Sequence, residues 1–255
     1  IIDYHLAGKA KNVSLEILDA KGNSIRKYSN SDTLYSFQDL YIPTYWIRPQ
    51  QILSAEAGSH RFVWDMHYQP LNVPPSLPIS ASYKNTAPVA TSPWILPGTY
   101  TAKLTVDGKT YSESFVVKMD PRVKTSAIDL QQQHDLSLMS YQHQLQSMNT
   151  LKELHDLRKQ IKEKLRDTKG SAINDLNDCD ARAASFEAAT PGSQQADFSS
   201  LNDSFASIFN SLQESDMPAL PQTVIAAKNA EQSFTALWSK WLELKQKIKT
   251  CIGEK

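Results

Sequence analysis

Apolar and polar residues alternate in short stretches over the first 120 residues, and a period of two is typical of half-buried β-strands. The stretch VSLEILDAKGNSIRKY alternates from Val13 to Ile17 and then reverses at Lys-Gly-Asn. The stretch GTYTAKLTVDGKTYSESFVVKM alternates on both sides of Asp107-Gly108, a pair that favours a tight turn. The pattern therefore predicts two β-hairpins.

The remaining features of this half predict further strands joined by long loops. IIDYHL reads as another strand, and ten of the thirteen prolines fall between residues 43 and 121, where they suit loops and edge strands. Short strands at this spacing predict a β-sandwich of immunoglobulin or fibronectin type III character over residues 1–120. Residues 70–97 are rich in Pro, Ser and Ala without a sustained period, so we expect a long irregular insertion there.

After residue 120 the apolar period changes to that of a helix. Four amphipathic helices are predicted, over residues 126–167, 171–188, 197–214 and 221–252, and Ser126 with Asp129 resembles a capping box. Helices of this length joined by short loops predict an antiparallel four-helix bundle over residues 124–255. The apolar stripe expected on the first helix comprises Leu138, Tyr141, Leu145, Met148, Leu151, Leu154, Leu157, Ile161 and Leu165.

Charge and hydropathy narrow the classes of partner. The 255 residues carry 27 basic and 27 acidic side chains, and neither half has the basic excess that binding to nucleic acid requires. No apolar run approaches the roughly 20 residues that span a bilayer, so no membrane span is expected. The chain begins at Ile1, already inside a predicted strand, which leads us to expect a piece processed or cut from a longer protein.

The stretch GSHRFVWDMHYQP carries the first candidate chemistry. As one strand, it places Phe62, Trp64, Met66 and Tyr68 towards the core and Arg61, Val63, Asp65 and His67 outwards. Asp65 and His67 then lie about 7 Å apart on one face and offer two metal ligands or an acid/base pair. No third ligand lies nearby in sequence, so a solvent-facing polar edge is the preferred interpretation.

Aromatic residues near prolines suggest binding instead of catalysis. YIPTYWIRPQ brings Tyr45, Trp46 and Arg48 together, and Trp94 lies in the irregular insertion. Such rings form platforms that stack on sugars in carbohydrate-binding modules. The alternative, which we prefer, is that they pack the insertion onto the sandwich or against an upstream domain, the partner expected for these residues.

The histidines and cysteines of the helical half have structural interpretations. The spacing of His134, His143 and His155 is not that of a helical zinc site, so solvated positions are expected for all three. Cys179 and Cys251 both fall on apolar stripes. They form either one disulfide, worth about 2–4 kcal/mol, or two reduced core residues.

Motifs of catalysis are missing from the sequence. It contains no Gly-rich phosphate loop, no G-x-S-x-G and no H-E-x-x-H, and we predict no catalytic residue, no cofactor and no metal.

Several stretches in order, IIDYHL, VSLEILDAKGNSIRKY, AGSHRFVWDMHY, the run from PWILPGTYTAKLTVDGK to MDPRVKTS, and LNDSFASIFNSLQESDMPALPQTV, resemble the C-terminal region of bacterial proteins with BNR/Asp-box, sortilin-like β-propeller repeats. Those proteins are often labelled glycosyl hydrolases. The resemblance implies an exported protein, periplasmic, outer-surface or secreted, in which propellers precede an immunoglobulin-like domain and a helical tail.

The residues that would define the propeller are not in this sequence, which has neither an Asp-box pattern nor a repeat of blade length. Any hydrolase activity would belong to the propeller. We therefore expect a non-catalytic accessory module that braces an upstream propeller of the same polypeptide or contacts another protein. The alternatives are a carbohydrate-binding module and, last, a hydrolase that uses Asp65 and His67.

Overall fold

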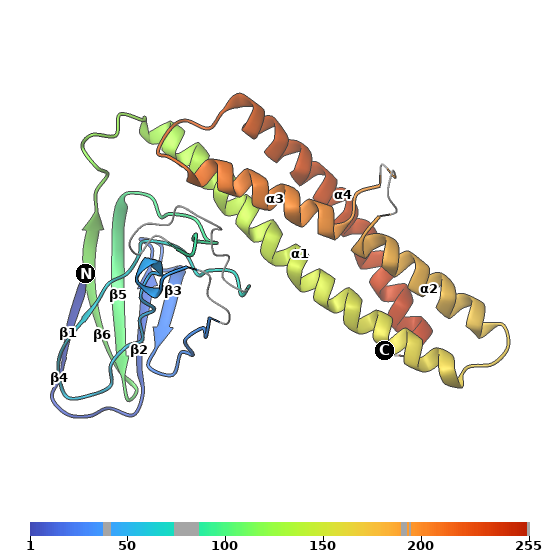
Figure 1. Cartoon of the computed structure of the whole chain (residues 1–255), viewed down its shortest axis with the longest axis horizontal. Coiled ribbons are helices and arrows are strands. Elements are labelled where there is room, and N and C mark those ends of the chain that lie inside the picture. Colours follow the sequence, from blue (N-terminus) through green and yellow to red (C-terminus); the bar gives the residue numbers. More distant parts are fainter. Residues whose placement is uncertain (38–41, 74–86, 190–192, 194, 254–255) are drawn as a thin grey trace. The chain divides into compact units, whose positions relative to one another are not determined.

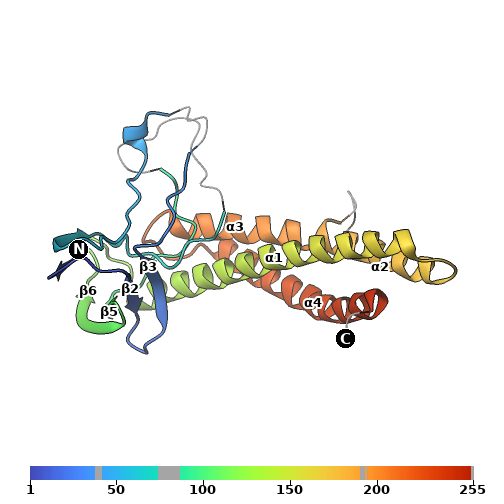
Figure 2. The same ribbon diagram turned by 90° about the horizontal axis from the view of Figure 1, so that it is seen from below.

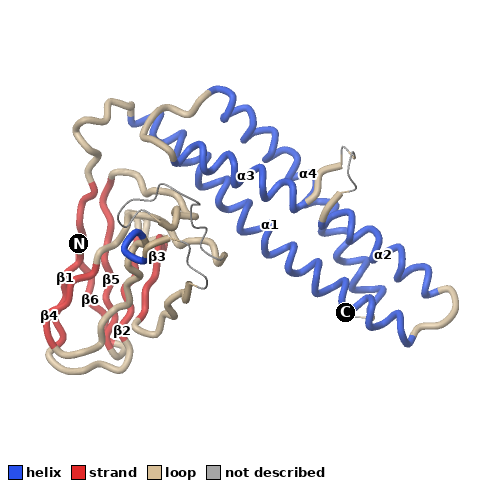
Figure 3. The backbone as a smooth tube through the Cα atoms, viewed as in Figure 1, coloured by secondary structure: helices blue, strands red, loops and turns tan. Residues whose placement is uncertain are grey.

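The computed structural model describes residues 1–37, 42–73, 87–189, 193 and 195–253. The chain divides into two compact units, Ile1–Lys124 and Thr125–Lys255. Every described strand lies in the first unit and every described α-helix in the second (Figure 3). The mixed content of strands followed by helices, predicted from the change of period, is therefore confirmed.

The larger sheet of the first unit is built from the two predicted hairpins (Figure 1). Strand β2 (Val13–Leu18) pairs with β3 (Ser24–Ser29), and β5 (Gly98–Val106) pairs with β6 (Lys109–Val117). All neighbours are antiparallel, in the order β3-β2-β5-β6. Asp107 and Gly108 join β5 to β6 with φ angles of 47° and 86°, the left-handed pair that a two-residue hairpin turn requires.

A second, two-stranded sheet pairs the beginning of the chain with the GSHRF stretch. Strand β1 (Ile2–Leu6) runs antiparallel to β4 (Gly58–Phe62), with Ile2 opposite Phe62. Both sheets contribute side chains to one apolar core, in which Trp64 packs edge-on against Tyr100 and Phe115. The buried members of this core are Leu6, Ala10, Val13, Leu15, Ile17, Ile25, Leu53, Phe62, Trp64, Ile95 and Tyr100.

Backbone contacts hold the described ends of the predicted insertion to the rest of the unit. Ile47, which follows the short helix η1 (Thr44–Trp46), forms a parallel bridge with Ala87, and His67 forms an antiparallel bridge with Trp94. Residues 74–86 of the insertion lie outside the described residues. The described part therefore brings the candidate residues of three separate loops into one region.

The second unit contains α1 (Ala127–Asp167), α2 (Ala172–Glu187), α3 (Phe198–Gln213) and α4 (Pro221–Ile252), each within one residue of its predicted range. Figures 1 and 2 both show α3 along the first part of α1 and α2 along the second part. The Arg158 guanidinium of α1 pairs with Asp180 of α2 at 2.8 Å. All four helices share one apolar core, whose largest fully buried side chains are Trp241, Phe198 and Phe205.

The first half of α1 buries the predicted set of residues only in part. Tyr141 is buried as predicted, but Leu145 is exposed and Leu138 and Met148 are half-buried. Polar positions are buried beside Tyr141, namely Ser137, Ser140, Gln144 and Ser147. Small side chains let a neighbouring helix approach closely, and α3 supplies the large apolar residues of this interface. The prediction was wrong at Leu138, Leu145 and Met148, because hydrophobicity alone does not identify an interface built from serines.

Candidate functional site

The Asp65–His67 segment does not continue strand β4. The alternation predicted for it holds for Phe62 and Trp64, which are buried. Met66 then adopts a left-handed backbone with φ of 60°, and a residue of that kind ends the two-residue alternation. As a result Met66 is 42% exposed and His67 only 4%, so the predicted inward Met66 and outward His67 were both wrong.

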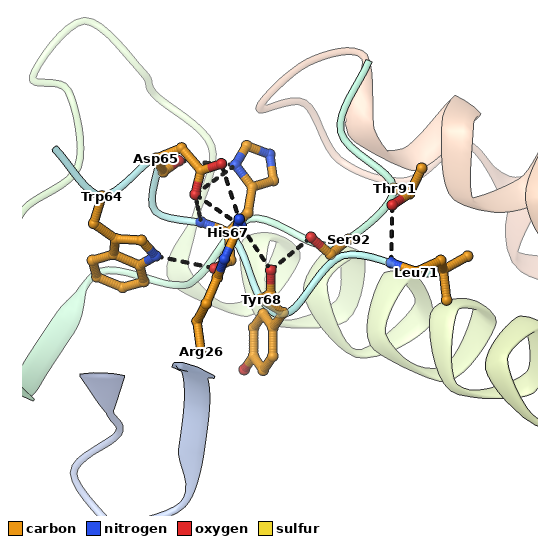
Figure 4. Close-up of polar contacts among 8 residues, drawn as sticks. All are labelled: Arg26, Trp64, Asp65, His67, Tyr68, Leu71, Thr91 and Ser92. Carbon is orange, nitrogen blue, oxygen red and sulfur yellow. Dashed lines mark hydrogen bonds and ion pairs between the residues drawn. The ribbon is translucent and has the colours of Figure 1, made fainter. Parts of the chain in front are cut away.

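His67 is fixed by contacts on several sides (Figure 4). Its Nδ1 lies 2.8 Å from the carbonyl oxygen of Asp65, and because a carbonyl only accepts, Nδ1 carries the proton. The imidazole lies against the Trp94 ring, with centroids 3.8 Å apart. The indole N–H of Trp64 donates to the His67 carbonyl at 3.1 Å. His67 is therefore buried, and its ring and its backbone are both held in place.

Asp65 has a cationic partner that the sequence pattern did not indicate. Arg26 of β3 donates from Nη1 to both Asp65 carboxylate oxygens, at 3.2 and 3.3 Å, and also to the Tyr68 carbonyl at 3.2 Å. The same guanidinium lies 4.9 Å from the centroid of the Tyr28 ring. Arg26 therefore ties β3 to the segment after β4, across 39 positions of sequence.

The environment of His67 favours its neutral form. Burial lowers the pKa of His67, the nearby Asp65 carboxylate opposes that shift, and the charges of Arg48 and Arg26 reinforce it. Arg48, which follows η1, is thus close enough to act on the ring electrostatically. Sequence reasoning placed Asp65 with His67 and Arg48 with Trp46, but only the fold unites Arg26, Arg48, His67 and Trp94.

Asp65 and His67 lie close together, but the side chain bonded to the Asp65 carboxylate is that of Arg26 and not a third metal-binding residue. The Asp65 Oδ1 and His67 Nδ1 atoms are 3.9 Å apart. Within the described residues, no group of three or more His, Cys, Asp or Glu side chains has an arrangement that would hold a metal ion. The chemistry of this cluster is that of an ion pair and a buried neutral imidazole.

Hydroxyl groups complete the cluster in Figure 4. The Ser92 hydroxyl, which is buried, donates to the Tyr68 carbonyl at 2.8 Å, and Thr91 Oγ1 accepts from the Leu71 N–H at 3.0 Å. These contacts satisfy backbone groups of a segment that has no regular strand pairing. These two contacts could not be predicted from the sequence, because Ser and Thr are common in any loop.

The predicted aromatic residues are partly exposed, in two pairs. Tyr45 is 67% exposed and packs edge-on against Trp46, with ring centroids 6.1 Å apart. Trp94 is 46% exposed and packs against His67. Both pairs therefore present ring surface to solvent while one side of each is supported.

The histidines of α1 differ from the prediction at two positions of three. His155 is exposed, as predicted, but His134 and His143 are half-buried. The ring of His143 lies 4.2 Å from that of Phe234 and 4.9 Å from that of Phe205, and burial lowers the pKa of His143 and of His134. The nonpolar environment explains why neutral imidazoles are favoured in this interior.

Cys179 and Cys251 are free thiols whose sulfur atoms lie 2.9 Å apart. Cys179 is buried in α2 and Cys251 is half-buried near the end of α4. The structure thus brings together the two residues that the sequence left as either a disulfide or two reduced core residues.

A shallow groove of the second unit is lined by α1 and by Trp238 of α4. Its α1 side presents amide and carboxylate groups, and its lining residues are Gln142, Leu145, Gln146, Asn149, Thr150, Glu153 and Trp238. The groups there are suited to hydrogen bonding and ring stacking.

No helix in the described part of the chain is long and apolar enough to cross a membrane. Comparison with family models, curated proteins and solved structures finds no significant match to this chain.

Proposed function

We propose that this chain is a non-catalytic accessory module of a larger exported protein, and that it braces a β-propeller of the same polypeptide or contacts another protein. One observation carries the proposal. Asp65 and His67, the candidates for metal binding or acid/base catalysis, hold the loops of the first unit together. Asp65 is neutralised by Arg26, and Nδ1 of His67 is bonded to backbone. Groups used in this way act as scaffold.

The proposal includes a finer description of the two units. We infer an immunoglobulin-like sandwich for the first unit and an antiparallel four-helix bundle for the second. The shared core of the two antiparallel sheets supports the sandwich, and the single core of the four helices supports the bundle. Both are architectures in which rigid modules of larger proteins are commonly built.

The proposal that the larger protein is exported and carries a β-propeller is based on the sequence resemblance. Five stretches, from IIDYHL to LNDSFASIFNSLQESDMPALPQTV, resemble in their order the C-terminal region of BNR/Asp-box proteins. This proposal predicts that the polypeptide which contains this chain also contains propeller blade repeats. Sequencing that polypeptide upstream of Ile1 tests it, and a sequence without blades would remove the propeller from the proposal.

Binding of carbohydrate is the second candidate, and the exposure of Trp94 and Tyr45 favours it. A ring that packs against His67 and is 46% exposed offers surface on which a sugar can stack. The Arg48 guanidinium nearby would add hydrogen-bond donors for sugar hydroxyls.

A glycan array probed with the purified chain separates the two candidates. The accessory proposal expects no glycan binding, no glycoside hydrolysis and, by titration calorimetry, binding to the purified propeller. Glycan binding that is lost in Trp94→Ala and kept in Val89→Ala, an exposed apolar residue of the same segment, would establish the carbohydrate candidate instead. Stoichiometric metal in the purified protein that disappears in His67→Ala would revive a hydrolase.

A further inference from the structure

The sulfur atoms of Cys179 and Cys251 meet across the second unit. Cys179 lies in α2 and Cys251 in the last turn of α4, 72 positions apart in sequence, yet their Sγ atoms are 2.9 Å apart. At that separation the two thiols are in hydrogen-bond contact, and either can be the donor. Each sulfur is thus the other's nearest reactive partner.

Neighbouring polar contacts hold both cysteines in place. Lys247, one turn before Cys251, pairs with Asp178, the residue before Cys179, at 2.7 Å. Lys164 Nζ of α1 donates to the Ile252 carbonyl at 2.8 Å, and Gly253 ends α4 with a left-handed backbone, φ 83°. The end of α4 is therefore fixed against both α1 and α2. These contacts hold the two sulfur atoms close together.

The two thiols differ in access to solvent. Cys179 is fully buried, and burial, followed by the contact with Cys251, raises the pKa of the Cys179 thiol to about 12. Cys251 is half-buried. An oxidant in solution therefore reaches Cys251 first, and Cys179 is placed to react second.

We propose that Cys179 and Cys251 are a redox site, which closes to a disulfide by exchange with a disulfide of a small thiol or of a thiol oxidoreductase. The Cys251 thiolate attacks one sulfur of the oxidant, forms a mixed disulfide and expels one thiolate. The Cys179 sulfur then attacks Cys251, gives up its proton to a leaving thiolate and expels the second thiol. Two protein thiols are oxidised and one external disulfide is reduced to two thiols.

Closure would tie α2 directly to the end of α4. Apart from packing, α2 is held by the ion pairs of Arg158 with Asp180 and Glu187 and of Lys247 with Asp178. A covalent link that closes a loop of this length reduces the freedom of the unfolded chain, so the oxidised protein should unfold at a higher temperature. The site does not depend on the propeller proposal, because every group involved lies in the helical unit.

The test incubates the whole chain with oxidised glutathione or with a phosphine reductant and compares the two forms. We expect the oxidised form to lose two hydrogen atoms by intact mass, to yield a linked peptide pair containing Cys179 and Cys251, and to unfold about 10 °C higher than the reduced form. Peptide mapping of the wild type requires no variant and therefore does not depend on whether a variant folds.

Two variants assign the order of reaction. Cys179→Ser should accumulate one glutathione on Cys251, whereas Cys251→Ser should stay unmodified, and neither should gain thermal stability on oxidation. The proposal is overturned if the wild type keeps two alkylatable thiols after oxidation, or if it carries two glutathiones without a cross-link.

Discussion

Arg26 is the cation around which the loops of the first unit are organised. It neutralises Asp65, reaches the Tyr68 carbonyl and lies over the Tyr28 ring, so one side chain serves three partners. Its side chain is 16% exposed and that of Asp65 is 30% exposed. At such burial, removal of one partner leaves a carboxylate partly desolvated and unpaired.

Replacement of Arg26 by Met is therefore expected to lower the free energy of unfolding by about 2 kcal/mol. Urea unfolding followed by tryptophan fluorescence measures this change. Arg61→Met is the matched control, because Arg61 pairs with Asp3 at the surface, where solvent screens the charges. Equal stability of both variants would mean that the Arg26 contacts contribute nothing beyond a surface pair.

The buried imidazole of His67 makes stability depend on pH. Since burial lowers its pKa, the unfolded chain takes up the proton more readily than the folded chain. The contribution is complete above the ordinary value of 6.5 and is lost as the pH falls below it. Asp65, Arg26 and Arg48 are the charged groups that act on the ring, and Asp65 alone opposes the loss.

Measured between pH 7.5 and 5.5, His67→Gln should therefore lose less stability on acidification than the wild type. One proton contributes a slope of at most about 1.4 kcal/mol per pH unit. His5→Gln, at an exposed position, is the control and should keep the wild-type slope. His134 and His143 keep their own contributions in both proteins, so a slope unchanged in His67→Gln would show that His67 does not contribute to the pH dependence.

Most contacts of the Asp65–His67 site could not be predicted from the sequence. The proximity of Asp65 and His67 followed from their spacing, but Arg26 is 39 positions from Asp65 and no local pattern connects them. The left-handed turn at Met66 was equally hidden, because methionine has no preference for that backbone, unlike Gly or Asn. Long-range pairing and unusual backbone are properties of the fold.

At the scale of elements, the ends of the helices are set by local hydrogen bonds. The Ser126 hydroxyl accepts from the Asp129 N–H at 3.1 Å, as the capping pattern predicted, and so begins α1. Ser171, in the same position before α2, makes no such bond with its side chain. The same residue type therefore has two different roles in one unit.

Ser126→Ala should lower the free energy of unfolding by about 1 kcal/mol, the usual contribution of a helix cap. Ser171→Ala should leave it nearly unchanged, since no capping bond is lost. Thermal unfolding followed by circular dichroism at helical wavelengths compares the two. A loss of similar size in both variants would indicate a general effect of serine at these sites and not capping.

Elements with a strong period were predictable and an interface of small residues was not. The hairpins β2–β3 and β5–β6 and all four helices follow from alternation, turn residues and three-four spacing. In the first half of α1 the same reasoning failed in part, because Ser137, Ser140 and Ser147 are buried whereas Leu138, Leu145 and Met148, which were expected inside, are not. Which residues of a helix form an interface depends on how closely the partner helix approaches.

For the whole molecule, the central feature is the presence of two separate apolar cores. One is built from residues 1–124, from strands and loops, and the other from the helices of residues 125–255. The described members of each core all belong to one unit. The units therefore have the properties of separately folding domains.

Residues 125–255 expressed alone are expected to give a helical circular dichroism spectrum and a single cooperative thermal transition. The matched comparison is the same segment carrying Phe205→Ala, which removes a fully buried ring and should lower the transition by several degrees. A segment that is helical but unfolds without a transition would mean that the helical core requires residues 1–124.

The length of α1 restricts how this protein can vary. Over 41 residues, about 60 Å, one buried stripe runs through Ser137, Gln144, Thr150, Leu157 and Ile161, with α3 along its first part and α2 along its second. A deletion of one residue in the middle would rotate the second part by about 100° against the first and face its leucines towards solvent. A deletion or insertion of seven residues would rotate it by only about 20°. Relatives of this chain should therefore differ in the length of α1 by steps of about seven residues, while its loops vary freely.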